Sequence, residues 1–189
     1  MCIIITSKKK IAERDAEIRK MYERDKHNYT DILLDYNMKA SVRNLNSYLE
    51  LEKSAVIKKV FINKQGVLSF VIMIPSGNYT YDFYVISSEI SHCGKTMSAH
   101  PCLMAKMLKD SEEIEIIDIL SKDYKRRGYG RAMMSVLFEF ASDNNIKAIS
   151  GKLSSVDEID PYNKKARDSF YKVMGFEFQG DRVIKEIKA

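Results

Sequence analysis

The stretch YKRRGYGR, residues 124–131, links a predicted strand to a predicted helix. Residues 113–121 before it (EIEIIDILS) are apolar and β-branched, and apolar residues recur at three- and four-residue spacing from Ala132 to Ala141 after it. That spacing is typical of an amphipathic helix. A glycine-containing turn entering a helix presents free backbone N–H groups, and the helix dipole favours negative charge there. The stretch therefore predicts a ligand that carries phosphate groups.

The glycine spacing fits neither a P-loop nor a dinucleotide fingerprint, because no Gly-Lys-Ser/Thr ending and no third glycine follow. The order of motifs is more informative. A strand, Lys-x-x-Gly-x-Gly and a helix are followed by a strand near residues 146–151. A later helix then contains Asn163-x-x-Ala166 and Phe170-Tyr171-x-x-x-Gly175-Phe176. This order, over residues 113–178, resembles the GNAT superfamily of N-acetyltransferases.

The resemblance implies an α/β (α+β) fold in which a mixed, mostly antiparallel central sheet with a bulged central strand is backed by helices. It also implies that the first motif grips the pyrophosphate of acetyl-CoA, with the acetyl-pantetheine arm along the strand. Lys125 stands where the family has Arg or Gln, and one extra residue separates Asn163 from Tyr171. The cofactor-binding residues expected on this basis are Ile117, Ile119, Leu120, Lys125, Arg126, Arg127, Gly128, Tyr129, Gly130, Arg131 and Asn163.

The strand before the motif changes its alternation. Ile114 and Ile116 alternate in one phase, whereas Ile117 and Ile119 alternate in the other. One extra residue near Ile116-Ile117 would absorb the change, and a β-bulge does this. A strand buried on both faces, which needs no alternation, is the alternative.

The predicted chemistry is acetyl transfer to an amine. A lysine-like amine is unprotonated in only about one part in 2,500 at pH 7, so a base must take its proton. Glu113 and Glu115 share one strand face, and Glu113 has the offset at which some GNAT enzymes place a general base. A strand N–H near Ile119 would stabilise the oxyanion, and the family gives Tyr171 the role of protonating the thiolate. The alternatives are solvated carboxylates for the glutamates and a core aromatic for Tyr171.

The composition is that of one globular domain. We expect 189 residues to form a single domain, with residues 1–110 as the acceptor-side half and 111–189 as the acetyl-CoA half. No apolar run reaches the length of a membrane span, and three widely spaced cysteines resemble reduced intracellular thiols, so the expected location is cytoplasmic. His92, Cys93, His100 and Cys102 lack zinc-finger spacing, and no metal is expected.

The net charge of +5 is concentrated near the motifs, and coenzyme A explains most of it, so a nucleic-acid partner is not favoured. The cations concerned are Lys125, Arg126, Arg127, Arg131, Lys164, Lys165 and Arg167.

Elsewhere the pattern predicts an opening strand at Cys2–Thr6, a helix from Ser7 to about Asn28, and another near Ser41–Glu52. Strands are expected at about Val56–Ile62, Val67–Ile74 and Thr80–Ile86, with turns at Gln65-Gly66 and Ser76–Asn78. Residues 87–110 read as an irregular insertion, with a short helix behind Pro101. A helix capped by Asp160 and ended by Gly175 precedes strands at Phe176–Gln179 and Arg182–Ile187.

The sequence thus favours an N-acetyltransferase that moves an acetyl group from acetyl-CoA to a primary amine within a ternary complex. The acceptor could be a small molecule, a protein or an aminoacyl-tRNA, and a homodimer is compatible with the chain. Two alternatives stay open: a non-catalytic acyl-CoA sensor or interaction protein on the same fold, and a nucleic-acid binder whose basic loop contacts phosphates.

Overall fold

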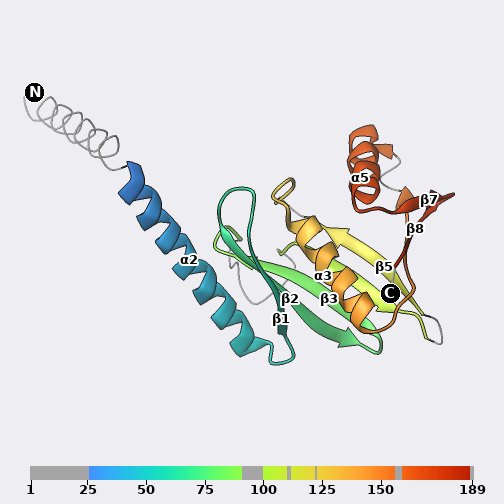
Figure 1. Cartoon of the computed structure of the whole chain (residues 1–189), viewed down its shortest axis with the longest axis horizontal. Helices are drawn as coiled ribbons and strands as arrows, with labels where there is room; N and C mark the ends of the chain where they lie inside the picture. The colour runs from blue at the N-terminus through green and yellow to red at the C-terminus, as the bar shows by residue number, and fades with distance from the viewer. Residues whose placement is uncertain (1–25, 91–99, 110–111, 122, 156–158, 188–189) are drawn as a thin grey trace, which may run out of the picture.

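The structure, a computed structural model, describes residues 26–90, 100–109, 112–121, 123–155 and 159–187, with side chains described from Tyr36 onward. A single sheet lies at its centre, and helices pack against both faces (Figure 1). The helices are α2 (Lys26–Leu51), α3 (Tyr129–Asp143) and α5 (Pro161–Val173). The strands are β1 (Val56–Ile62), β2 (Leu68–Gly77), β3 (Thr80–Ser87), β4 (Cys102–Met107), β5 (Glu113–Leu120), β6 (Ala148–Lys152), β7 (Glu177–Gln179) and β8 (Arg182–Glu186).

The eight strands run in the order β1-β2-β3-β4-β5-β6-β8-β7. Every neighbouring pair is antiparallel except β5 and β6, which are parallel and joined through α3. A parallel pair needs a crossover connection, and α3 supplies it. The predicted fold class, a mixed and mostly antiparallel sheet backed by helices, is confirmed.

The main core lies between the sheet and α3. Alternate residues of the strands point to this face, among them Val71, Leu103 and Ile114, and they pack against Met133 and Leu137 of α3. All five side chains are at most 1% exposed, so this side of the sheet is a dry, enclosed core.

The opposite face carries a smaller cluster under α2. Leu45 of α2 packs against Phe70, Ile72, Ile74 and Ile86, which alternate with the residues of the main core. In the part of the chain that the structure describes, no helix is long and apolar enough to cross a membrane.

The structure confirms the elements predicted around the motifs. The strand expected at residues 113–121 is β5, the helix after the glycines is α3, and the strand near 146–151 is β6. Asp160 caps α5, since its carboxylate accepts a hydrogen bond of 2.9 Å from the Tyr162 N–H, and Gly175 follows the helix with a φ of +81°. The final strand pair and the three strands between residues 56 and 87 are also confirmed.

Within the segment 87–110, the helix predicted behind Pro101 is wrong, and residues 91–99 and 110 lie outside the described residues. The expected helix behind Pro101 is β4, which lies inside the sheet between β3 and β5. Leu103, Met104, Met107 and Leu108 have helical spacing, but Leu103 and Ala105 are buried and the strand is covered on both faces near its start. A short apolar run of this kind does not alternate, so periodicity cannot separate it from a buried helix.

Two other boundaries differ from the prediction. The helix expected at Ser41–Glu52 lies within α2, which the structure describes as one continuous helix from Lys26 to Leu51. Strand β2 runs on through Ser76-Gly77, and the turn falls at Asn78-Tyr79, where Tyr79 has a φ of +65°. The strand predicted at Cys2–Thr6 and most of the helix after it lie outside the described residues.

Candidate functional site

Strand β5 carries the predicted bulge. Met104 of β4 lies opposite Asp118, and Ala105 lies opposite Ile116, so Ile117 has no partner on β4. The Ile117 side chain is 54% exposed although it belongs to a central strand. One extra residue in one strand of an antiparallel pair defines a β-bulge, and the prediction at Ile116-Ile117 is confirmed.

The sheet forks at the same point. On its other side, β5 pairs with β6 only from Glu113 to Ile116, opposite Ala148 to Gly151. Ile117 has no partner on either strand, and from Asp118 to Leu120 the ladder continues with β4 alone. Unpaired strand backbone is a template for a further hydrogen-bonding partner, and here it lies directly before the basic loop.

That loop leads into helix α3, whose N-terminus has no side-chain cap. Gly128, the residue before α3, has a φ of +92°, and no side chain caps the helix there. Arg126 also has a positive φ, of +64°. The first N–H groups of an α-helix have no intrahelical acceptor, and together with the dipole they attract anions. The loop geometry thus suits a phosphate.

The two glycines of the loop serve different purposes. Gly128 is required by its backbone conformation, since a Cβ there would meet only Lys64 Cγ at 3.7 Å. At Gly130 a Cβ would lie 3.2 Å from the Phe170 ring of α5. Gly130 therefore lets α5 approach the first turn of α3, a helix–helix role that the motif alone did not reveal.

A buried polar network lies beneath the loop. The Tyr129 side chain is 2% exposed, and its hydroxyl accepts a hydrogen bond of 2.9 Å from Asn63 Nδ2 and lies 3.1 Å from Ser87 Oγ. Asn63 Nδ2 also donates to Glu89 Oε1 at 2.7 Å, and Glu89 forms an ion pair with Arg127. Tyr129 and Arg127, both expected at the cofactor site, are thus tied to the protein by their side chains. Because the Tyr129 side chain is buried, Tyr129 can offer a ligand only its backbone N–H.

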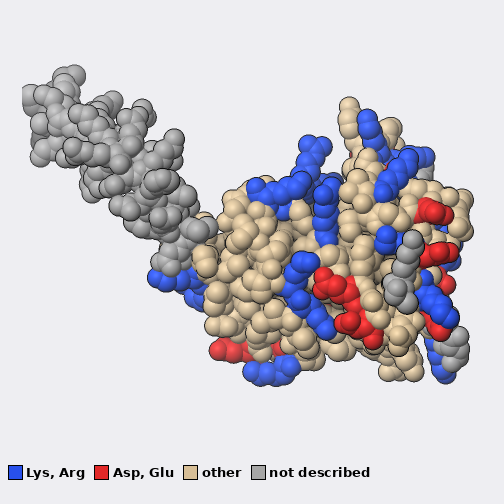
Figure 2. Space-filling model, in the orientation of Figure 1, with Lys and Arg blue, Asp and Glu red and all other residues tan. Residues whose placement is uncertain are grey.

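The other cations of the loop face outward. Lys125 Nζ donates a hydrogen bond of 3.5 Å to Asn163 Oδ1 of α5, which brings two predicted cofactor residues together. Figure 2 shows Lys and Arg side chains gathered over the loop before α3 and over α5. The positive charge lies where the helix dipole already favours an anion.

Tyr171 lies inside the main core. It is 8% exposed, and its ring makes edge contacts with Phe170 and Phe176 at centroid distances of 5.6 and 5.2 Å. Its place on the α3 face of the sheet, in the cluster that contains Ile114 and Ile116, puts it on the side of β5 from which α5 approaches.

Glu113 and Glu115 lie on the opposite face, because they alternate with the buried Ile114 and Ile116. Ser150 Oγ donates a hydrogen bond to Glu113 Oε1. Arg182 of β8 lies 3.3 Å from Glu115 Oε1 and 3.9 Å from Glu113 Oε1. Both carboxylates are about one-third exposed, so this acidic pair remains open to an incoming group.

The N–H expected to hold an oxyanion is already engaged. The Ile119 N–H donates a hydrogen bond of 2.7 Å to Oδ1 of Asp118, an exposed carboxylate. An oxyanion at Ile119 therefore requires the Asp118 side chain to rotate away. Two features of the candidate site were not predicted from the sequence: the contact of the Asp118 carboxylate with the Ile119 N–H, and the support of the loop by Asn63 and Glu89. The turn predicted at Gln65-Gly66 is the only signal near Asn63.

In the part of the chain with described side chains, no three His, Cys, Asp or Glu residues lie close enough together to hold a metal ion. His100 is buried with Nδ1 3.0 Å from the Val85 carbonyl oxygen, and Cys102 is a buried free thiol. His92 and Cys93 lie outside the described residues.

No protein-family model matches the chain, and no curated protein does. Solved structures with a similar fold are GNAT-type acetyltransferases. The ribosomal-protein-S18-alanine N-acetyltransferase from Escherichia coli is 14% identical, with a TM-score of 0.43 over 60% of this chain and 73% of that one. A GNAT-family acetyltransferase from Staphylococcus aureus Mu50 is 10% identical, with a TM-score of 0.43 over 58% and 69%. Nourseothricin acetyltransferase is 11% identical, with a TM-score of 0.43 over 71% and 88%. This likeness concerns the fold, and the argument for activity rests on the chain's own residues.

Proposed function

We propose that the chain is an acyltransferase that moves the acetyl group of acetyl-CoA to a primary amine. The observation that carries the proposal is the coincidence of the bulged, forked end of β5 with the uncapped N-terminus of α3. The fork would receive the pantetheine arm along the backbone from Ile117 to Leu120. The loop at Gly128 would bind the pyrophosphate through backbone N–H groups.

The two faces of the sheet then supply different groups. The amine would enter from the open face, where Glu113 or Glu115 takes its proton directly or through a water molecule. The amine nitrogen attacks the thioester carbon, a C–N bond forms, and the C–S bond breaks. Tyr171, on the α3 face, would donate the proton that the departing thiolate takes up. Asp118 must release the Ile119 N–H before that N–H can stabilise the oxyanion.

A non-catalytic acyl-CoA binder is the second candidate, and specific contacts favour it. Asp118 occupies the Ile119 N–H, and Arg182 and Ser150 engage the two glutamates. A protein that only binds acyl-CoA needs the loop and the fork, and those contacts would not impede it.

A screen of amine acceptors separates the two functions. The full chain is incubated with acetyl-CoA and, in turn, polyamines, lysine peptides, peptides with free N-termini and aminoacyl-tRNA, and release of free thiol is followed. The acyltransferase proposal expects release that depends on one acceptor class and is lost in Tyr171→Phe. Binding of acetyl-CoA without acceptor-dependent release in any class would support the binder.

A further inference from the structure

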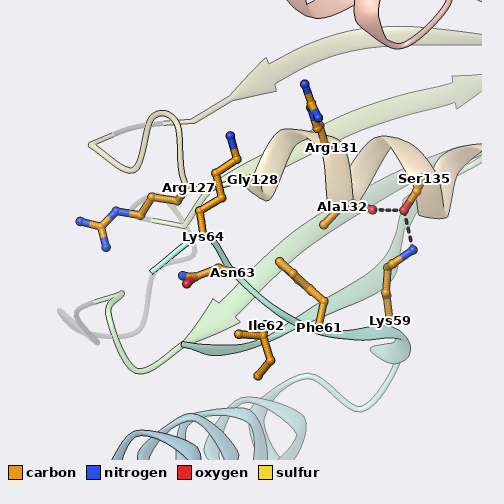
Figure 3. Close-up of a pocket in the computed structure, with 10 residues that line it drawn as sticks. All are labelled: Lys59, Phe61, Ile62, Asn63, Lys64, Arg127, Gly128, Arg131, Ala132 and Ser135. Carbon is orange, nitrogen blue, oxygen red and sulfur yellow. Dashed lines mark hydrogen bonds between the residues drawn. The ribbon is translucent and has the colours of Figure 1, made fainter. Parts of the chain in front are cut away.

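A basic cavity of about 290 Å³ lies between β1 and the first turns of α3, beside the loop at Gly128 (Figure 3). Phe61 and Ala132 supply apolar surface within it. Four cations from two separate parts of the chain line it: Lys59, Lys64, Arg127 and Arg131. The cavity is on the β1 side of α3, whereas α5 packs against Gly130 and the forked end of β5 lies on the far side of β4 from β1.

Among the residues with described side chains, two of these cations have a partner. Lys59 Nζ donates to Ser135 Oγ at 2.8 Å and lies 3.5 Å from Glu139 Oε1. Arg127 is paired with Glu89. The side chains of Lys64 and Arg131 form no ion pair or hydrogen bond with any residue in the described ranges. Their side chains extend on either side of Gly128 toward the same side of the cavity in Figure 3.

Lys64 is held in place by the turn that carries it. The neighbouring Asn63 is 6% exposed, and its Oδ1 accepts hydrogen bonds from the N–H groups of Gln65 and Val67 at 2.9 and 3.0 Å. The Lys64 N–H donates to the Arg127 carbonyl oxygen at 3.2 Å, which joins the turn to the basic loop. The backbone that carries the Lys64 side chain is therefore held against the start of α3.

We propose that Lys64 and Arg131 form a subsite for a phosphate monoester, and that its occupant is the 3′-phosphate of coenzyme A. This inference rests on the proposed function. A monoester carries close to two negative charges at neutral pH, which matches the two cations whose side chains have no partner in the described ranges. The pyrophosphate can be bound by backbone N–H groups alone, whereas this second group of donors consists of side chains. Coenzyme A carries both kinds of phosphate in one molecule.

Binding of coenzyme A and of 3′-dephospho-coenzyme A to the full chain, measured by calorimetry, tests the subsite. Wild-type protein should bind the dephospho compound about ten-fold more weakly, a typical effect of one charge-assisted hydrogen bond. Lys64→Gln and Arg131→Gln should each lose about five- to ten-fold in affinity for coenzyme A and less than two-fold for the dephospho compound. Lys58→Gln is the matched control, because Lys58 is an exposed cation of β1 outside the cavity, and it should change neither affinity.

Equal affinity of the wild type for the two compounds would overturn the subsite and leave the proposed function standing. A loss of affinity in Lys64→Gln that is the same for both compounds would also overturn it, because Lys64 would then contact the pyrophosphate. If coenzyme A itself does not bind the wild type, the proposed function fails and the subsite fails with it.

Discussion

The two faces of the sheet differ in how completely they are covered. On the α3 face, one continuous core runs from β2 to β8 and includes Leu137 and Tyr171. On the α2 face, the buried cluster is confined to β2, β3 and Leu45. Further along this face, Glu113, Glu115 and Arg182 remain partly exposed. In the proposed function, the closed face would hold Tyr171, and the open face would leave room for the amine acceptor.

The strongest test of this contrast is Tyr171→Phe on the closed face. If Tyr171 protonates the thiolate, turnover should fall by about 10²- to 10⁴-fold, the usual contribution of a positioned acid. Affinity for acetyl-CoA should survive because the ring and its contacts with Phe170 and Phe176 remain. Single-turnover rate and melting temperature are measured on the same variant. A stable variant with full activity would make Tyr171 a core aromatic only.

A matched pair of core substitutions compares the faces in stability. Leu137→Ala should lower the free energy of unfolding by about 3–5 kcal/mol, since Leu137 is fully buried in the enclosed core. Leu45→Ala should cost about 2–3 kcal/mol, because the smaller cluster under α2 can relax around the cavity. Urea unfolding of both variants provides the comparison. Equal losses would show that α2 packs as tightly as α3.

The smallest expected effect concerns the open face. Glu113→Gln should reduce turnover about ten-fold at neutral pH, because water or Glu115 can replace part of its function. The reduction should shrink at high pH, where the amine is already unprotonated. A pH–rate profile of the variant checks this expectation, and a loss of the same size at every pH would remove Glu113 as the base.

The burial of each strand also explains which parts of the fold could be predicted from the sequence. Alternation, glycines and a known cap residue predicted the elements from β5 to β8, the bulge at Ile117 and the cap at Asp160. The sequence did not predict strand β4, because an apolar strand buried on both faces has no alternation of apolar and polar residues. The support of the loop by Asn63 and Glu89 depends on the tertiary approach of residues that lie 26 positions apart, and no local pattern encodes it. The contact between Asp118 and the Ile119 N–H joins adjacent residues, but it depends on the side-chain rotamer of Asp118, which alternation does not predict.

The central claim is that the start of α3 binds the phosphates of acetyl-CoA. Isothermal titration of acetyl-CoA into wild-type protein and into Gly128→Val tests it most directly. A β-branched residue is strained at a φ of +92° and places a side chain where a phosphate must approach. Acetyl-CoA should bind the wild type saturably, and it should bind at least about a hundred-fold more weakly to a variant that circular dichroism shows to be folded. A wild type that does not bind acetyl-CoA at millimolar concentration, or a folded Gly128→Val that binds it equally well, would show that the start of α3 does not hold these phosphates.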